Sequence, residues 1–176
     1  MILTLDNSSL TLLINPGANP PVDPATGTPL KYAKERVEGL VEGLTAQDRL
    51  IIPTPVLAEV MVEAGEGAPE IIDKLQTLAR IQILPFDTRA AVELAVMTRE
   101  AIQAGSKKGS SSAPWNKVKF DRQIIAISRV ASADAIYSDD EEFCKFAQSV
   151  GMATRSTWEL PVPQRTAGLF DGLDGD

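Results

Sequence analysis

The chain has 176 residues, a hydrophobic share of 44%, a formal net charge of -7 and no histidine. This length fits one domain that buries a sizeable core without disulfides or metal staples. The lack of histidine excludes the commonest general base and the commonest zinc ligand, so any metal here should be hard and oxygen-bound. The overall acidity argues against non-specific binding of nucleic acid by the whole surface.

The single cysteine, Cys144, excludes an internal disulfide. Beside Phe143 in a predicted helix, it is interpreted as a buried small hydrophobe. The opening apolar run is interrupted by Asp6 and has no basic region before it, unlike a secretory signal. Since no apolar stretch approaches membrane-spanning length, we expect a cytoplasmic protein with no membrane partner.

In the first half of the chain, residues 2–5 predict a short buried strand, and Asp6 follows it with turn and helix-cap chemistry. Residues 15–29 carry five prolines and two glycines, which predicts an exposed loop inside the domain. An amphipathic helix is expected over residues 30–44 and a second strand over 50–52. A proline-initiated helix then carries Glu59 on its flank.

The second half continues the alternation, with expected helices over 71–79 and 89–104, a helix opening at Asp121 and another over 141–150. Strands are expected over 81–85, 135–137 and 152–154, and residues 105–119 are expected to be irregular. Alternating strands and helices predict parallel pairing by right-handed crossovers. We therefore expect an α/β fold, a three-layer α/β/α sandwich with a mainly parallel central sheet, over residues 1–160. Residues 161–176 are expected to form a flexible acidic tail.

Several acids fall at strand ends or helix starts, which share one edge of an open α/β sheet. Asp6, Asp121, Asp139 and Asp140 are therefore expected to converge, and their mutual repulsion favours Mg²⁺ or Mn²⁺ among them. Such an ion can activate a water for in-line attack on a phosphodiester. Taken singly, the aspartates fit helix caps and Glu59 fits a solvated helix flank, so only the joint placement favours a site.

Four short motifs, in this order, resemble the PIN-domain ribonucleases, many of which are VapC-like toxins of type II toxin–antitoxin pairs. They are Leu3–Ser8, Pro53–Val60, Phe120–Ala126 and Ile136–Phe143, and the resemblance covers most of the chain up to about Thr154. It implies a metal-dependent endoribonuclease with an RNA substrate, and it brings in an antitoxin protein and a homodimer as candidate partners.

The resemblance also assigns residues. It implies catalytic roles for Asp6, Glu59, Asp121 and Asp140, with Asp6, Asp121 and Asp140 holding the metal. Asp139 competes with Asp140 as the fourth ligand, and both alternatives stay open. Ser138 matches a hydroxyl that assists at the metal, and Ser8 stands where an asparagine is common. Ser8 and Ser138 are therefore also candidates for contact with the substrate.

The segment 105–119 is the best candidate for RNA contact, because its lysines have no compensating acid and its tryptophan could stack on an unpaired base. The residues concerned are Lys107, Lys108, Lys117, Lys119 and Trp115. The alternative is a solvated loop in which Trp115 packs down as an anchor. Arg122 is expected either to touch phosphate or to pair with a neighbouring acid.

Two other functions compete with the nuclease. A haloacid-dehalogenase-like phosphatase also has an aspartate after the first strand, but it expects a second aspartate where this chain has Ser8. A catalytically inactive PIN-like module would instead bind protein or RNA. If Glu59 points away from the other acids, the inactive module gains support; if all four acids lie close together, it loses support.

Overall fold

The computed structural model describes residues 1–15, 17–109 and 111–163. Five strands form one sheet in the order β3-β2-β1-β4-β5, and every neighbouring pair is parallel. The strands are β1 (Ile2–Leu5), β2 (Arg49–Pro53), β3 (Ile81–Leu84), β4 (Ala135–Tyr137) and β5 (Thr154–Arg155). The predicted α/β class with a parallel central sheet is confirmed.

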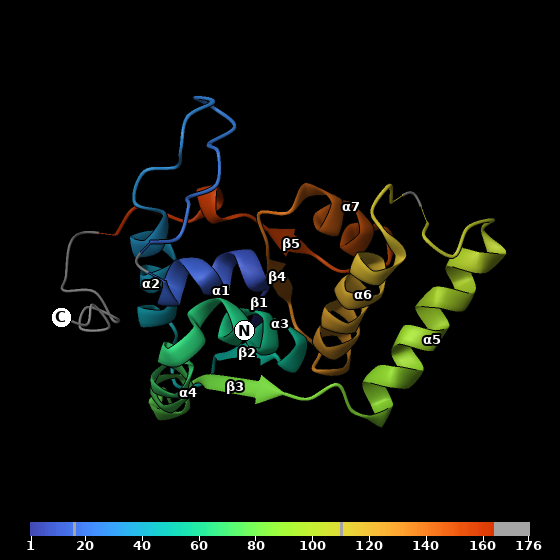
Figure 1. The fold of residues 1–176 in the computed structure, drawn as a ribbon, viewed down its shortest axis with the longest axis horizontal. Coiled ribbons are helices and arrows are strands. Elements are labelled where there is room, and N and C mark those ends of the chain that lie inside the picture. The colour runs from blue at the N-terminus through green and yellow to red at the C-terminus, as the bar shows by residue number, and fades with distance from the viewer. Residues whose placement is uncertain (16, 110, 164–176) are drawn as a thin grey trace.

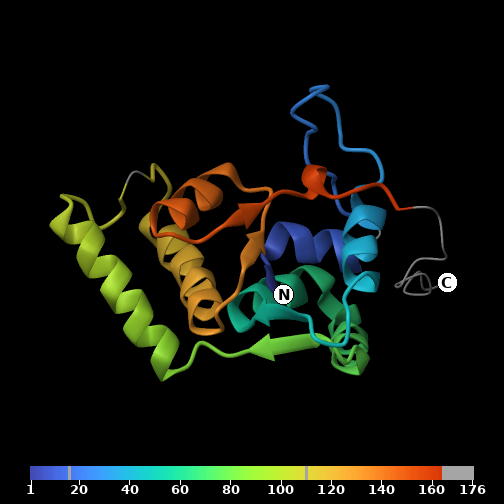
Figure 2. The ribbon, with the colours of Figure 1, turned by 180° about the vertical axis from the view of Figure 1, so that it is seen from behind.

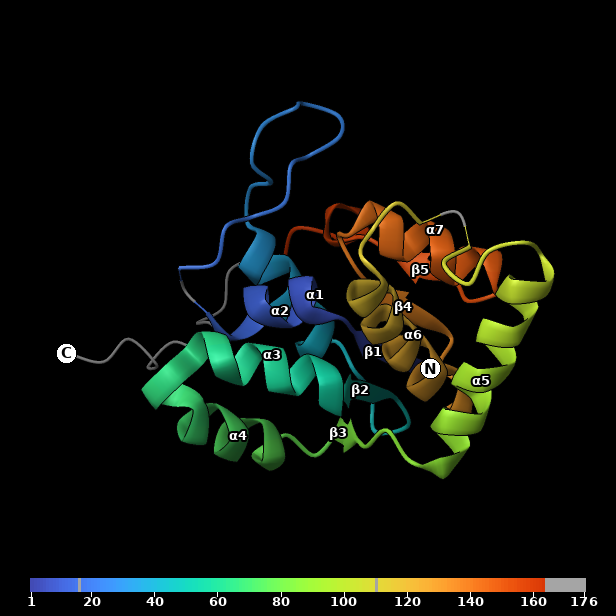
Figure 3. The same cartoon turned by 45° about the vertical axis from the view of Figure 1, so that its right-hand side comes forward.

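Helices connect successive strands. They are α1 (Asn7–Ile14), α2 (Ala33–Glu42), α3 (Thr54–Ala64), α4 (Ala68–Thr77), α5 (Thr88–Gln103), α6 (Trp115–Val130) and α7 (Glu141–Ser149), with short 3₁₀ turns η1 (Gly65–Gly67) and η2 (Thr157–Glu159). The chain steps outward from β1 to β3 and then crosses back to β4 and β5. Because such crossovers are right-handed, this reversal places helices on both faces of the sheet, as the three-layer prediction requires. Figure 3 shows α1 to α4 gathered on one side of the molecule and α5 to α7 on the other.

The core lies between the central strands and the helices that cover them. β1 and β2 are almost continuously apolar and buried, as expected for strands covered on both faces. Helix α5 packs along α6 at the outer end of the molecule (Figures 1 and 2). Fully buried members of the core include Leu5, Leu10, Leu13, Leu50, Ile52, Leu75, Ile125 and Ile136.

Within the proline-rich segment, the described residues 17–29 lie outside regular helices and strands, as predicted, and this part of the chain projects from the body (blue in Figure 1). An isolated antiparallel bridge joins Val22, in the middle of this segment, to Pro29 at its end. Of the predicted tail, only residues 161–163 fall within the described part, so the division at residue 160 stays a prediction. In the described ranges, no helix has the length and apolar character to cross a membrane.

The start of α6 corrects the sequence prediction, which had the helix opening at Asp121. The helix begins six residues earlier, directly after Pro114, because the residues between contain no glycine or proline and Val118 packs into the interior. Lys117 and Asp121 therefore lie one helical turn apart on the same face. The last strand is also shifted, to Thr154–Arg155, because Met152 turns into the core while Thr154 pairs with Ile136.

Candidate active site

The candidate site begins where the two central strands end. Leu5 of β1 lies beside Tyr137 of β4 in the sheet, and the backbone N–H of Asp6 donates to the Tyr137 carbonyl at 3.0 Å. From this point the chain leaves β1 toward β2 and leaves β4 toward β5, in opposite directions. A parallel sheet opens a crevice at such a switch point. Asp6 and Ser138 stand at the mouth of this crevice.

Asp6 is buried and tied to both strand ends. Its Oδ1 accepts hydrogen bonds from Ser8 Oγ at 2.7 Å and from the backbone N–H of Ser9 at 3.1 Å, which caps α1. Its Oδ2 accepts from the hydroxyl of Ser138, which in turn accepts from the backbone N–H of Asp140 at 3.1 Å. The two serines that were predicted to contact the substrate therefore fix the orientation of the first aspartate.

Four carboxylates from four elements line one pocket of about 600 Å³. Asp6 follows β1, Glu59 lies on α3, Asp121 on α6, and Asp140 is the N-cap of α7. These are the four acids predicted to be catalytic, and the structure brings them to a common space. The full lining is Asp6, Asn7, Ser8, Glu59, Asn116, Lys117, Phe120, Asp121, Ile124, Asp140 and Phe143.

The electrostatics of the pocket reflect crowding of negative charge. Burial raises the pKa of Asp6 to about 6, against the opposing effect of its hydrogen bonds. Burial also raises the pKa of Asp121 to about 6, and the charges of Asp140, Asp6 and Glu59 add to this effect. The pKa of Glu59 is raised by burial and by the charge of Glu63. Such shifts at convergent carboxylates are typical of functional sites.

Lys117 enters the pocket and forms an ion pair with Asp140 through its Nζ and the carboxylate Oδ2. Burial favours the neutral carboxyl, but the bonds from Lys117 and from the backbone N–H of Phe143 hold the pKa of Asp140 below its ordinary value. Burial lowers the pKa of Lys117, whereas Asp140, Asp121 and Asp6 together raise it above its ordinary value. The ammonium is thus held among the acids.

The side chain of Asp139, unlike that of Asp140, does not line the pocket. Its two carboxylate oxygens accept from the backbone N–H and the hydroxyl of Thr157, at 2.7 Å and 2.6 Å, which joins it to η2. Its own backbone N–H donates to Ser8 Oγ at 2.9 Å. Asp139 therefore anchors the end of β4, and the carboxylate that lines the pocket is that of Asp140.

The remaining predicted substrate contacts lie outside the pocket lining. Arg122 is fully buried: its guanidinium lies 4.8 Å from the ring centre of Phe146 and 5.5 Å from that of Trp115, and its Nη1 donates to Thr98 Oγ1. It therefore has no exposed surface with which to bind phosphate. Trp115 is half-buried between Arg122 and Lys107, whose Nζ lies 4.8 Å from the ring centre. This arrangement favours the anchor interpretation of Trp115.

Lys108, in the same segment, donates to the Ser112 carbonyl at 3.5 Å. Cys144 is half-buried and its thiol lies 3.5 Å from the Ser138 carbonyl, which fits a small packing residue. Neither side chain lines the acidic pocket.

The four acids line one pocket, but their carboxylates do not form a complete set of metal ligands. Among the described residues, no three acidic or thiol side chains are grouped closely enough to hold one metal ion. Asp6 is bonded to serines, Asp140 to Lys117, and Asp139 to Thr157. The predicted ligand set therefore stays a prediction.

The sequence interpretation gave no site role to five residues of the pocket lining: Asn7, Asn116, Phe120, Ile124 and Phe143. Asn116 was assigned to the irregular segment 105–119, and Phe120 lay just before the expected helix, but the early start of α6 places both in the same helix as Asp121. Pro114 was the signal for that early start, because proline is often found just before or within the first helical turn.

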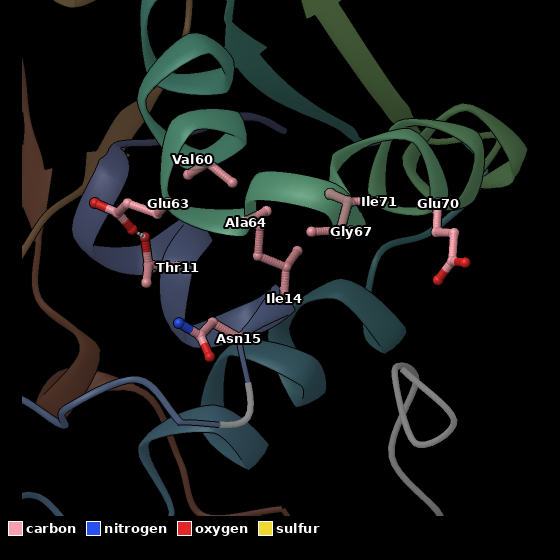
Figure 4. A pocket seen from close by; sticks show the side chains of 9 residues that line it. All are labelled: Thr11, Ile14, Asn15, Val60, Glu63, Ala64, Gly67, Glu70 and Ile71. Atoms are coloured by element: carbon pink, nitrogen blue, oxygen red, sulfur yellow. Dashed lines mark hydrogen bonds between the residues drawn. The ribbon is translucent and has the colours of Figure 1, made fainter. Parts of the chain in front are cut away.

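A second pocket, of about 250 Å³, lies between α1, α3 and α4 and is drawn in Figure 4. There Thr11 and Glu63 point toward each other, and the threonine Oγ1 donates to the carboxylate at 3.3 Å. The lining otherwise mixes apolar side chains such as Ile14, Val60 and Ile71 with Asn15. It contains none of the four predicted catalytic acids, so the site is assigned to the larger pocket.

The PIN-domain family model matches residues 31–148, well over half of the chain. The matched range includes Glu59, Asp121 and Asp140 and begins after Asp6. No curated protein matches the sequence. The family match decides against the haloacid-dehalogenase-like alternative.

Solved structures of similar fold extend over nearly the whole chain. FitAB bound to an IR36 DNA fragment has a TM-score of 0.57 and 20% identity, covering 92% of this chain and 98% of that one. VapBC-1 from nontypeable Haemophilus influenzae has a TM-score of 0.58 and 17% identity, covering 90% and 99%. VapC20 from Mycobacterium tuberculosis, a sarcin–ricin loop cleaving toxin, has a TM-score of 0.50 and 15% identity, covering 86% and 96%. At these identities the likeness shows a common fold, and together with the family model it means that the chain belongs to the PIN-domain family.

Proposed function

We propose that this protein is a metal-dependent endoribonuclease that hydrolyses RNA phosphodiester bonds in the acidic pocket. The observation that carries the proposal is the gathering of Asp6, Glu59, Asp121 and Asp140 from four separate elements around one pocket. Keeping four carboxylates together is costly unless they serve a cation, and two of them have pKa values raised to about 6. Glu59 lies with the other acids, which disfavours the inactive binding module.

The chemistry of the donors fits a hard divalent cation, because the acidic side chains and the neighbouring serines offer only oxygen atoms. Asp6, Asp121 and Asp140 would hold Mg²⁺ or Mn²⁺, and Glu59 would add a further negative charge to the pocket lining. A bound ion would supply Lewis-acid polarisation of the phosphate and an activated water. The protein contributes orientation: Ser8 and Ser138 fix the Asp6 carboxylate, and the α7 cap fixes that of Asp140.

The proposal is tested by incubating the purified protein with a mixed single-stranded RNA in Mn²⁺, in Mg²⁺ and in chelator. Cleavage is expected with at least one of the metals and not with chelator, and adding back the metal in excess should restore it. Cleavage that persists in chelator would contradict a metal-dependent mechanism. If neither metal supports cleavage of a mixed RNA, the binding-module function is favoured instead.

The two acids after β4 are expected to differ in function. Asp140→Asn should lower the cleavage rate at least about 100-fold, because even residues that only orient a metal ligand contribute about 10- to 100-fold. Asp139→Asn should lower it less than about tenfold, since Asp139 bonds to Thr157 instead of lining the pocket. Single-turnover rates of both variants, measured well below their melting temperatures, check the order. A larger loss for Asp139→Asn would assign the fourth ligand to Asp139.

We extend the proposal to a toxin role, with an antitoxin protein as partner. The support is the family resemblance together with the similar fold of VapC20, which is a toxin, and of the VapBC-1 and FitAB assemblies. A homodimer rests on the family resemblance alone and stays a prediction. Growth arrest on induced expression, abolished by Asp121→Asn, is the expected result for a toxin.

A further inference from the structure

Among the described residues that line the acidic pocket, Lys117 is the only basic one. Its ammonium pairs with Asp140, and its charge also acts on Asp121, Asp6 and Glu59. It therefore stands within electrostatic reach of all four acids. One positive charge offsets only part of their negative charge, whereas a divalent ion would offset twice as much.

Local helix physics does not favour a lysine at this position. Lys117 is the third residue of α6, where the helix dipole disfavours a cation and favours an acid. The first turn of α6 contains no acidic residue, and its N-cap, Pro114, has no side chain that can bond to the helix. The favourable partners of Lys117 are the carboxylates that enter the pocket from other elements and Asp121, one turn further along α6.

The turn that carries Lys117 is fixed from two sides. Trp115 is held between Lys107 and the buried Arg122. The segment before α6 is tied to α7, because the hydroxyls of Ser111 and Ser112 both donate to Glu142, at 3.1 Å and 3.0 Å. These contacts keep the start of α6 beside the start of α7, where Asp140 is the cap.

We propose that Lys117 is a built-in counter-cation of the pocket, which a divalent ion must displace from Asp140 before the carboxylates can close around the ion. This inference rests on the proposed function, because it takes the pocket to be a metal site. It explains why four acids line one pocket although, within the described residues, no three are grouped closely enough for a metal. It also means that Lys117 stabilises the metal-free protein and weakens its affinity for the ion, so that nuclease activity is gated by metal concentration.

The test is Mn²⁺ binding measured by calorimetry for the parent, Lys117→Met and Lys119→Met. Methionine keeps most of the aliphatic stem and removes the charge. Lys119 is exposed on the same helix and lies outside the pocket lining, so its variant controls for the change in net charge. Lys117→Met is expected to bind Mn²⁺ about tenfold more tightly than the parent, and Lys119→Met is expected to match the parent. Equal or weaker binding by Lys117→Met would overturn the inference.

Thermal melting provides a second readout that does not depend on activity. In chelator, Lys117→Met should melt below the parent because the acids have lost their counter-cation. In saturating Mn²⁺ the deficit should disappear, since the ion replaces the lysine. A deficit that is the same in both conditions would assign Lys117 a purely structural role. If the parent itself binds no Mn²⁺, the proposed metal site fails, which is distinct from equal binding by parent and variant.

Discussion

Replacing Asp121 with asparagine is expected to lower kcat/KM for RNA cleavage at least about 1000-fold, or about 4 kcal/mol of transition-state stabilisation. The change removes one carboxylate charge while nearly preserving the shape of the side chain. Asp121 lines the pocket, where the negative charges of Asp140, Asp6 and Glu59 act on it. A pocket that holds a cation should be strongly weakened by losing this charge.

The control separates lost chemistry from lost folding. Asp73→Asn removes a carboxylate from the exposed surface of α4, outside the pocket, and should cleave RNA like the parent. Asp121→Asn should melt no lower than the parent in chelator, because burial and the neighbouring acids outweigh the favourable charge of Lys117 and make the ionised Asp121 unfavourable. Mn²⁺ should raise the melting temperature of the parent and of Asp73→Asn, with a much smaller rise for Asp121→Asn. Cleavage by Asp121→Asn at the parent's rate would rule out the acidic pocket as the catalytic centre.

Much of the architecture could be predicted because local patterns and global topology agree. The apolar runs of β1, β2 and β4 are short, bounded and separated by helical periodicity, which indicates a parallel sheet. Once the sheet is parallel, strand ends share an edge, and Asp6 and Asp140 are brought together by topology. Glu59 was the least certain of the four, because a glutamate on a helix flank is usually solvated. Its place at the pocket depends on how α3 packs.

The parts that could not be predicted depend on contacts between distant residues. Asp139 and Asp140 are adjacent in sequence, and only the pairing of Asp139 with Thr157 in η2 separates their environments. Arg122 is charged and was expected either to touch phosphate or to pair with a neighbouring acid, yet it is buried against Trp115 and Phe146. The spacing of residues along one chain does not indicate which aromatic rings a buried arginine will pack against. Because the start of α6 was placed too late, Lys117 was interpreted as a loop residue.

Replacing Asp6 with asparagine is expected to stabilise the metal-free protein at neutral pH. The pKa of Asp6 is raised from 3.8 to about 6 in the folded state, chiefly by burial. Between these values the folded protein binds more protons than the unfolded chain, so the free energy of unfolding falls as pH rises through this window. Below about pH 4 both states are protonated and the penalty is absent; above about pH 7 it is complete. Two pKa units correspond to about 3 kcal/mol.

Asparagine resembles the protonated aspartate and does not ionise, so Asp6→Asn should escape this penalty. In chelator, the free energy of unfolding of Asp6→Asn minus that of the parent should increase by roughly 2–3 kcal/mol from pH 4 to pH 8, which means that the variant becomes the more stable protein. Urea titrations across this range measure the difference, with the surface variant Asp73→Asn as the control. Saturating Mn²⁺ at pH 8 should reverse the order, because the parent gains binding energy that the variant lacks. A difference in free energy of unfolding that stays constant across pH would show that the pKa of Asp6 is not raised. The expected result is a variant that is more stable than the parent in chelator and less stable in Mn²⁺. It would mean that the fold tolerates a destabilising carboxylate at the end of β1 because the cation site requires it.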